Sequence, residues 1–96
     1  MFVSFIVYQE IERKLLEKHG VTVLEVEEAF YNLTGEYARE VRPMNHGEHP
    51  RYWFISKTNA GHRLKVVFVD DPEETRPVLI TAYNPNEEEE ELYASL

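Results

Sequence analysis

Basic, aromatic and histidine side chains gather in one stretch of the chain, residues 51–65, and their types suit work on a phosphodiester. Cations bind phosphate and stabilise negative charge that develops in a transition state, and an aromatic ring can stack on a base. RNA carries its own nucleophile, the 2′-hydroxyl, so its cleavage needs a base, an acid and cations but no metal ion. These residue types predict RNA binding, with metal-independent cleavage as the reaction.

Two sets of residues are assigned to this chemistry. The catalytic candidates are His62, Arg63, Lys57 and Arg51, and the candidates for RNA binding in the same stretch are Trp53 and Lys65. His62 is the candidate for proton transfer because the pKa of histidine lies near neutrality. An ordinary solvent-exposed sheet face and a solvated turn histidine explain the same residues, so both alternatives stay open.

Charge is distributed unevenly along the 96 residues, whose formal net charge is −8. Residues 39–65 hold six basic and two acidic residues, whereas the remainder holds four basic and sixteen acidic ones. Sign asymmetry of this kind bears on partners more directly than the total does. An anionic partner is therefore expected at the basic segment in spite of the negative total.

Length and composition predict a single domain over residues 1–96, with a hydrophobic fraction of 43% that is ordinary for a globular protein. The absence of cysteine excludes disulfides, thiolate catalysis and a cysteine-based zinc site. The opening "MFVSFIV" is too short to span a membrane, lacks the features of a secretory signal, and is typical of a first strand. A cytoplasmic protein without a membrane partner is expected.

No metal or other cofactor is expected. His46 and His49 lie three residues apart in a predicted loop, with Glu48 between them. Two loop histidines are a weak signal, because a metal site needs three or more ligands of suitable geometry.

Two helices are predicted before any long strand. The first runs from Tyr8 to Gly20, with Gly20 in the left-handed position just past its end. The second begins at Thr22, which has the spacing of a capping box with Glu25, and ends at Gly35. They form a helical hairpin with a very short joint.

Strands are predicted at 37–43, 51–58, 62–70 and 76–83, with a turn at "NAG" that uses a positive φ at Gly61. If Lys57 lies opposite Arg63, alternation sorts the hairpin onto two faces. The core face holds Tyr52, Phe54, Leu64, Val66 and Phe68, and the other face holds Arg51, Trp53, Ile55, Lys57, Arg63, Lys65 and Val67. Phe54, Val66 and Phe68 are predicted to pack against Ile11, Leu15, Val26 and Phe30.

The five consecutive glutamates from Glu87 to Glu91 fit the start of a C-terminal helix. Asn84 is the predicted cap, with Asn86 and Glu89 as a competing capping box. Favourable interaction with the helix dipole explains two or three glutamates but not five. The others either keep the helix soluble, receive a basic partner or restrict RNA, and the helix is expected beside the basic face without crossing it.

The order of motifs resembles the BrnT toxins of bacterial toxin–antitoxin pairs, in the RelE-like ribonuclease superfamily. The similarity runs from about Tyr8 to Tyr93 through "EKHGVT", "EVEEAFYN", "RYWFISKTNAGHRLKVVF" and "ITAY". A related group of uncharacterised small domains shares the "ITAY"-type ending. By this resemblance Arg51 opens the aromatic strand, Lys57 and Arg63 keep the basic positions of the hairpin, and Glu89 and Tyr93 belong to the last helix.

The chain departs from this family next to the last helix. Tyr83 and Asn84 stand where BrnT-like sequences have two arginines, and glutamates replace basic residues of the helix itself. Tyr83 is assigned to RNA binding with Trp53 and Lys65. One flank of the expected RNA surface has therefore changed sign.

The predicted fold is α+β and RelE-like, with a helical hairpin packed on an antiparallel sheet of three to five strands and a C-terminal helix. The resemblance implies the toxin component of a type II toxin–antitoxin pair, an mRNA endoribonuclease that meets RNA or the ribosome and is neutralised by a cognate antitoxin protein. The alternative is a non-catalytic protein-interaction domain on the same scaffold. The oligomeric state stays open.

Overall fold

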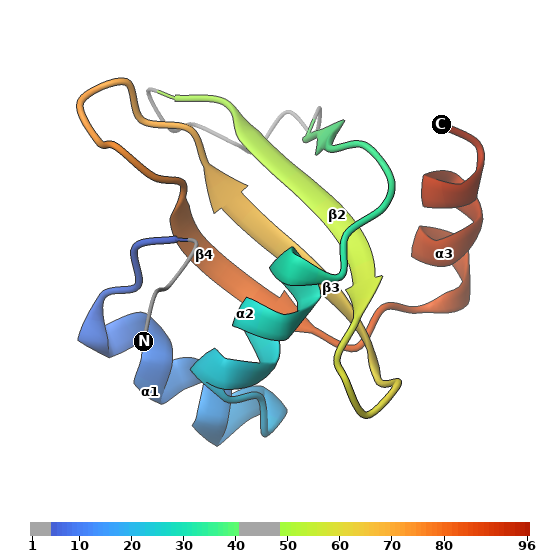
Figure 1. Cartoon of the computed structure of the whole chain (residues 1–96), viewed down its shortest axis with the longest axis horizontal. Coiled ribbons are helices and arrows are strands. Elements are labelled where there is room, and N and C mark those ends of the chain that lie inside the picture. The colour runs from blue at the N-terminus through green and yellow to red at the C-terminus, as the bar shows by residue number, and fades with distance from the viewer. Residues whose placement is uncertain (1–4, 41–48) are drawn as a thin grey trace.

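The computed structural model describes residues 5–40 and 49–96 of the chain, which form an α+β fold. N-terminal helices pack on a four-stranded antiparallel sheet with the strand order β1-β2-β3-β4, and a C-terminal helix follows the last strand. Figure 1 shows the sheet running between α1 and α2 on one side and α3 on the other. The predicted fold class is confirmed.

The first helical segment is α1 (Gln9–Lys14), and it continues as a π-helical turn, η1 (Leu15–His19). Gly20 ends this segment with a φ of 64°, as expected for a left-handed cap. The second helix, α2 (Val23–Tyr31), begins with the predicted capping box, in which Thr22 and Glu25 each accept a hydrogen bond from the other's backbone N–H.

Helix α2 stops at Tyr31, so the prediction that it continues to Gly35 is wrong. Asn32 follows the last turn, and its side-chain amide donates to the backbone oxygen of Lys57 and to Oδ1 of Asn59. These two bonds attach the end of the helix to the β-hairpin. The chain then crosses to the sheet edge.

The sheet consists of β1 (Ala38–Arg39), β2 (Arg51–Lys57), β3 (Arg63–Val69) and β4 (Val78–Tyr83). Lys57 lies opposite Arg63, and every further pair of the predicted β2–β3 register is confirmed out to Tyr52 opposite Phe68. Gly61 supplies the positive φ of the hairpin turn, at 90°. A bulge between β3 and β4 shifts the register after Val67.

The main core lies between the helices and one sheet face. Phe54, Val66 and Phe68 are buried there with Leu15 and Val26, and the partly buried Ile11 and Phe30 pack against them, as predicted. The Phe30 ring meets Phe54 edge-on, at 4.9 Å between centroids. This core fixes which sheet face carries the cations, because alternate side chains must point the other way.

Other predictions are met only in part. Of the expected first strand, Ile6 forms a single parallel bridge to Val78, while residues 1–4 lie outside the described part. Helix α3 (Glu87–Ala94) is capped by Asn86 in a capping box with Glu89, so the competing cap is confirmed and Asn84 is not the cap. No helix in the described ranges, 5–40 and 49–96, is long and apolar enough to cross a membrane.

Candidate functional site: the basic sheet face under helix α3

The sheet face opposite the main core is itself covered. Ala38, Trp53, Ile55 and Val67 are buried together there, and the partly buried Ile80 and Tyr93 pack against them. Tyr93 comes from α3, and its ring lies 5.6 Å from that of Trp53. Helix α3 therefore packs on the basic face, and the prediction that it lies beside this face without crossing it is corrected.

The centre of the contact is an ion pair between Lys65 and Glu89. Lys65 Nζ lies 2.7 Å from Glu89 Oε2, and the Lys65 side chain is only 4% exposed. The Tyr83 hydroxyl donates to the same carboxylate oxygen at 2.8 Å. The Lys65 ammonium also lies 4.6 Å from the centre of the Trp53 ring, which adds a cation–π contact. All three predicted RNA-binding residues, Trp53, Lys65 and Tyr83, are thus brought together, with Glu89 in their midst.

The pKa values of this cluster follow from its contacts. Burial alone would raise the pKa of Glu89, but hydrogen bonds from Lys65, the Asn86 backbone and Tyr83 outweigh it, so the pKa lies below its ordinary value. Burial raises the pKa of Tyr83, and its hydrogen bond to Glu89 acts in the same direction. At neutral pH Glu89 is ionised and Tyr83 is protonated. A carboxylate with a lowered pKa that already accepts two side-chain hydrogen bonds is a poor general base.

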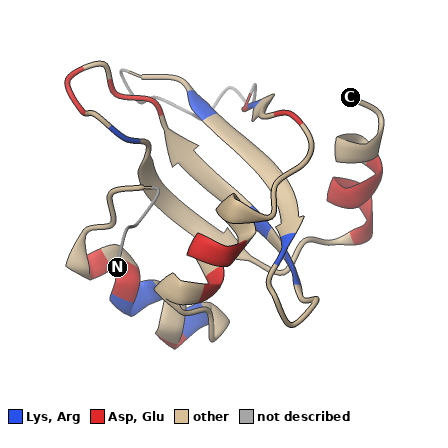
Figure 2. Cartoon of the chain, viewed as in Figure 1, with Lys and Arg blue, Asp and Glu red and all other residues tan. Residues whose placement is uncertain are grey.

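A second pair, Arg63 with Glu90, lies nearer the solvent. Two guanidinium nitrogens of Arg63 donate to the two carboxylate oxygens of Glu90, at 2.8 Å and 2.6 Å. This bidentate contact lowers the pKa of Glu90 and raises that of Arg63. A fork-to-carboxylate pair uses the donors with which a guanidinium would otherwise bind phosphate. Figure 2 shows the acidic run of α3 beside the sheet that carries these cations.

The four catalytic candidates do not form one cluster. Lys57 and Arg63 are cross-strand neighbours, and both side chains reach solvent. Arg51 lies at the other end of β2, six residues from Lys57, which at about 3.3 Å per residue is roughly 20 Å away. A single phosphate cannot meet both ends of the strand.

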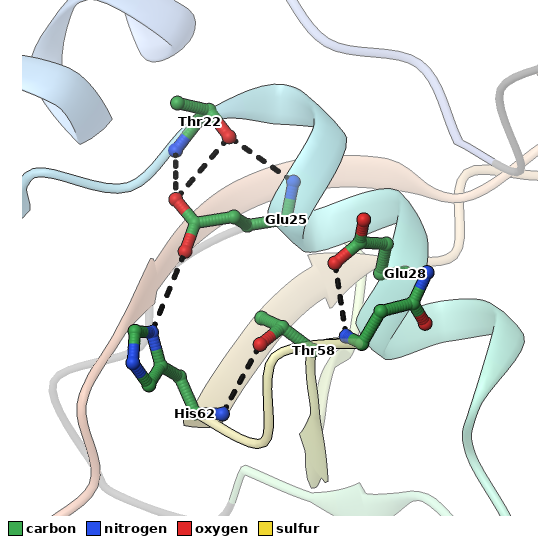
Figure 3. Close-up of polar contacts among 6 residues, drawn as sticks. Thr22, Glu25, Glu28, Thr58 and His62 are labelled. Atoms are coloured by element: carbon green, nitrogen blue, oxygen red, sulfur yellow. Dashed lines mark hydrogen bonds and ion pairs between the residues drawn. The ribbon is translucent and has the colours of Figure 1, made fainter.

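His62 points away from these cations. Its imidazole Nδ1 lies 3.9 Å from Glu25 on α2, on the side of the sheet that faces the helices, and the side chain is 72% exposed (Figure 3). Its backbone N–H donates to the Thr58 hydroxyl within the turn. The Asn59 backbone N–H donates to Glu28 of the same helix. The hairpin tip is therefore attached to α2 by polar contacts, and His62 belongs to that attachment.

Residues that could hold a metal ion are not grouped in the part of the chain that the structure describes. His49 lies 3.5 Å from Asp71, whereas His46 and Glu48 lie outside the described residues. His19, the last residue of η1, lies with its ring tilted at 37° to the Tyr83 ring, 5.6 Å between centroids, and so contacts the edge of the Lys65 cluster.

The contacts of Glu89, Glu90 and Tyr93 with the sheet were not predicted from the sequence. One signal was present, since Trp53, Ile55 and Val67 are too apolar for a face that meets only water. Comparisons with models of protein families, with curated proteins and with solved structures find no match for this chain.

Proposed function

We propose that this chain is a non-catalytic protein-interaction domain of the cytoplasm, built on a scaffold whose motifs resemble the BrnT-like ribonucleases. One observation carries the proposal: the chain's own helix α3 occupies the residues that RNA would need. Lys65 and Trp53 are 4% and 5% exposed, and Glu89 holds the Lys65 ammonium. While α3 is in place, little of either side chain is left for a phosphate or a base to contact.

The energetics of the contact support this assignment. A buried charge that loses its partner is strongly unfavourable, so removing Glu89 from Lys65 without a replacement costs about 3–5 kcal/mol. An RNA strand would have to compensate for this loss and for the lost packing of Tyr93 on Trp53. Meanwhile the acidic outer side of α3 repels a polyanion. A protein partner does not have to compensate for these losses, because it can bind the chain while α3 stays packed on the sheet.

A second candidate, the RNA-cleaving toxin with its cognate antitoxin, is favoured by the hairpin end of the basic face. The Lys57 side chain is exposed and has no side-chain partner in the described part of the structure, and the Arg63 side chain opposite it is 48% exposed. Two cations at this spacing can bind a phosphate. This candidate requires α3 to leave the face, or a substrate that needs only these two residues and no cofactor.

Expression in bacteria separates the two candidates. The interaction domain predicts normal growth at verified expression, and no cleavage of total cellular RNA by the purified protein. Growth arrest that Lys57→Ala with Arg63→Ala relieves would establish the toxin instead. Arg13→Ala with Lys18→Ala is the matched control, because it removes the same charge from exposed positions of the first helical segment.

A further inference from the structure

Helix α3 turns two glutamates and Tyr93 toward the sheet, whereas leucines at its C-terminal end are exposed. Glu89, Glu90 and Tyr93 face the sheet, whereas Leu92 and Leu96 are 56% and 65% exposed. A surface helix ordinarily shows the reverse arrangement, with its apolar stripe on the core. Leu92 in the last turn of α3 and Leu96 just past its end therefore indicate a surface for another molecule.

A groove lies beside these leucines. It has a volume of about 480 Å³ and runs between α3 and the β1–β2 edge, and its walls include Leu92, Leu96, Ala38, Trp53, Glu88 and the Lys65–Glu89 pair. This volume falls within the roughly 300–1,000 Å³ of pockets that take small ligands, so several side chains fit. The groove offers apolar surface from both α3 and the sheet to one occupant.

In the described part of the chain, the charge around the groove is mainly acidic. Lys65 and Arg63 neutralise Glu89 and Glu90, but Glu87, Glu88 and Glu91 are exposed and have no side-chain partner in the described residues. Glu88 lines the groove itself, and Glu87 and Glu91 are its neighbours on the helix. Arg39 is one cation on the opposite wall. Glu87, Glu88 and Glu91 are thus the glutamates left for a partner, and of these only Glu91 lies beyond the first turn, where the helix dipole acts.

We infer that this groove binds a segment of a partner protein that carries lysine or arginine beside one or two large apolar side chains. The apolar side chains enter between Leu92, Leu96 and Ala38, and the cations pair with Glu88 and its neighbours. This partner assignment rests on the proposed function, since RNA bound on the whole basic face would require α3 to move and would dismantle the groove.

A library of random 16-residue peptides, displayed on phage and selected on the immobilised full chain, tests the inference. Enriched peptides are expected to carry at least two basic residues and a large apolar one. Their binding should weaken at least about tenfold on Leu92→Ser with Leu96→Ser. Leu16→Ser with Leu24→Ser is the matched control, because those leucines are 59% and 51% exposed on the N-terminal helices. Circular dichroism of each variant verifies that it folds.

A charge series completes the test. Glu88→Gln with Glu91→Gln should weaken binding several-fold at low salt and have little effect at 0.5 M salt, because exposed charges are screened. Glu73→Gln with Glu74→Gln removes the same charge in the β3–β4 turn and should change nothing. Enrichment of acidic or uncharged peptides, equal binding to the leucine variant, or no enrichment would overturn the groove. The interaction-domain proposal is tested separately, by bacterial growth and RNA cleavage. A failure of the peptide-binding test would therefore reject the groove without rejecting that proposal.

Discussion

Glu89→Gln is the substitution that shows most clearly how the buried Lys65–Glu89 pair differs in energy from the exposed Arg63–Glu90 pair. The change removes the carboxylate charge 2.7 Å from Lys65 Nζ, yet glutamine remains compatible with the capping box. The Lys65 side chain, 4% exposed in the unmodified chain, then has the Trp53 and Tyr83 rings as its remaining neighbours. Breaking a buried pair in this way is expected to lower the free energy of unfolding by about 3–5 kcal/mol.

Helix α3 can limit that loss by detaching, because water then solvates Lys65. Urea unfolding is therefore followed by two signals, far-ultraviolet circular dichroism for the whole chain and fluorescence of Trp53, the only tryptophan. If α3 detaches first, the fluorescence transition of the variant moves to lower urea than the dichroism transition. If it does not, both transitions move together.

Two comparisons make the magnitude decisive. Glu90→Gln removes the same charge from a pair whose side chains are 48% and 33% exposed, so its cost should be about 0–1 kcal/mol. Lys65→Met added to Glu89→Gln should recover most of the loss, because an apolar side chain tolerates the same site. Equal small costs for Glu89→Gln and Glu90→Gln would refute the burial of Lys65 beneath α3.

Three further outcomes are expected. The pKa of Glu89 in the folded chain lies below its ordinary value of 4.5, so ionised Glu89 stabilises the docking of α3 at pH values above 4.5. This stabilisation is lost as the pH falls through the lower pKa of the folded chain. Iodide quenching of Trp53 should therefore rise only below about pH 4.5. Thr22→Ala removes a capping side chain and should cost about 1 kcal/mol in urea unfolding. Gly35→Ala places a methyl group 2.7 Å from the Tyr93 hydroxyl, displaces it from its hydrogen bond, and should cost about 0.5–1.5 kcal/mol by the same measurement.

The sequence predicted the sheet well because its determinants are local. With the "NAG" turn as the hairpin joint, the assumed pairing of Lys57 with Arg63 is confirmed, and alternation then gave the register out to Phe68. The capping box of Thr22 and the left-handed Gly20 were also local signals. The early end of α2 has no local signal, because Asn32 bonds to residues 25 and 27 positions away.

The sequence predicted which sheet residues belong to the candidate site, but not the helix that covers them. Trp53, Lys65 and Tyr83 do lie together, but the glutamate that binds Lys65 is 24 residues further along the chain and sits in a run that looks solvated. Alternation shows that two cations share a face, and it cannot show that a later helix docks there. Strand alternation likewise could not predict on which side of the sheet the His62 side chain lies, because His62 is in the turn rather than in a strand.

The central claim is that α3 shields the basic face of the sheet, and acrylamide quenching of Trp53 in the unmodified chain at neutral pH tests it most directly. Trp53 is 5% exposed beneath Tyr93 and Lys65, so a small quenching constant is predicted, well below that of the same chain in concentrated urea. A constant as large as in the urea-unfolded chain would mean that α3 does not cover the face, and the face would then be open to RNA.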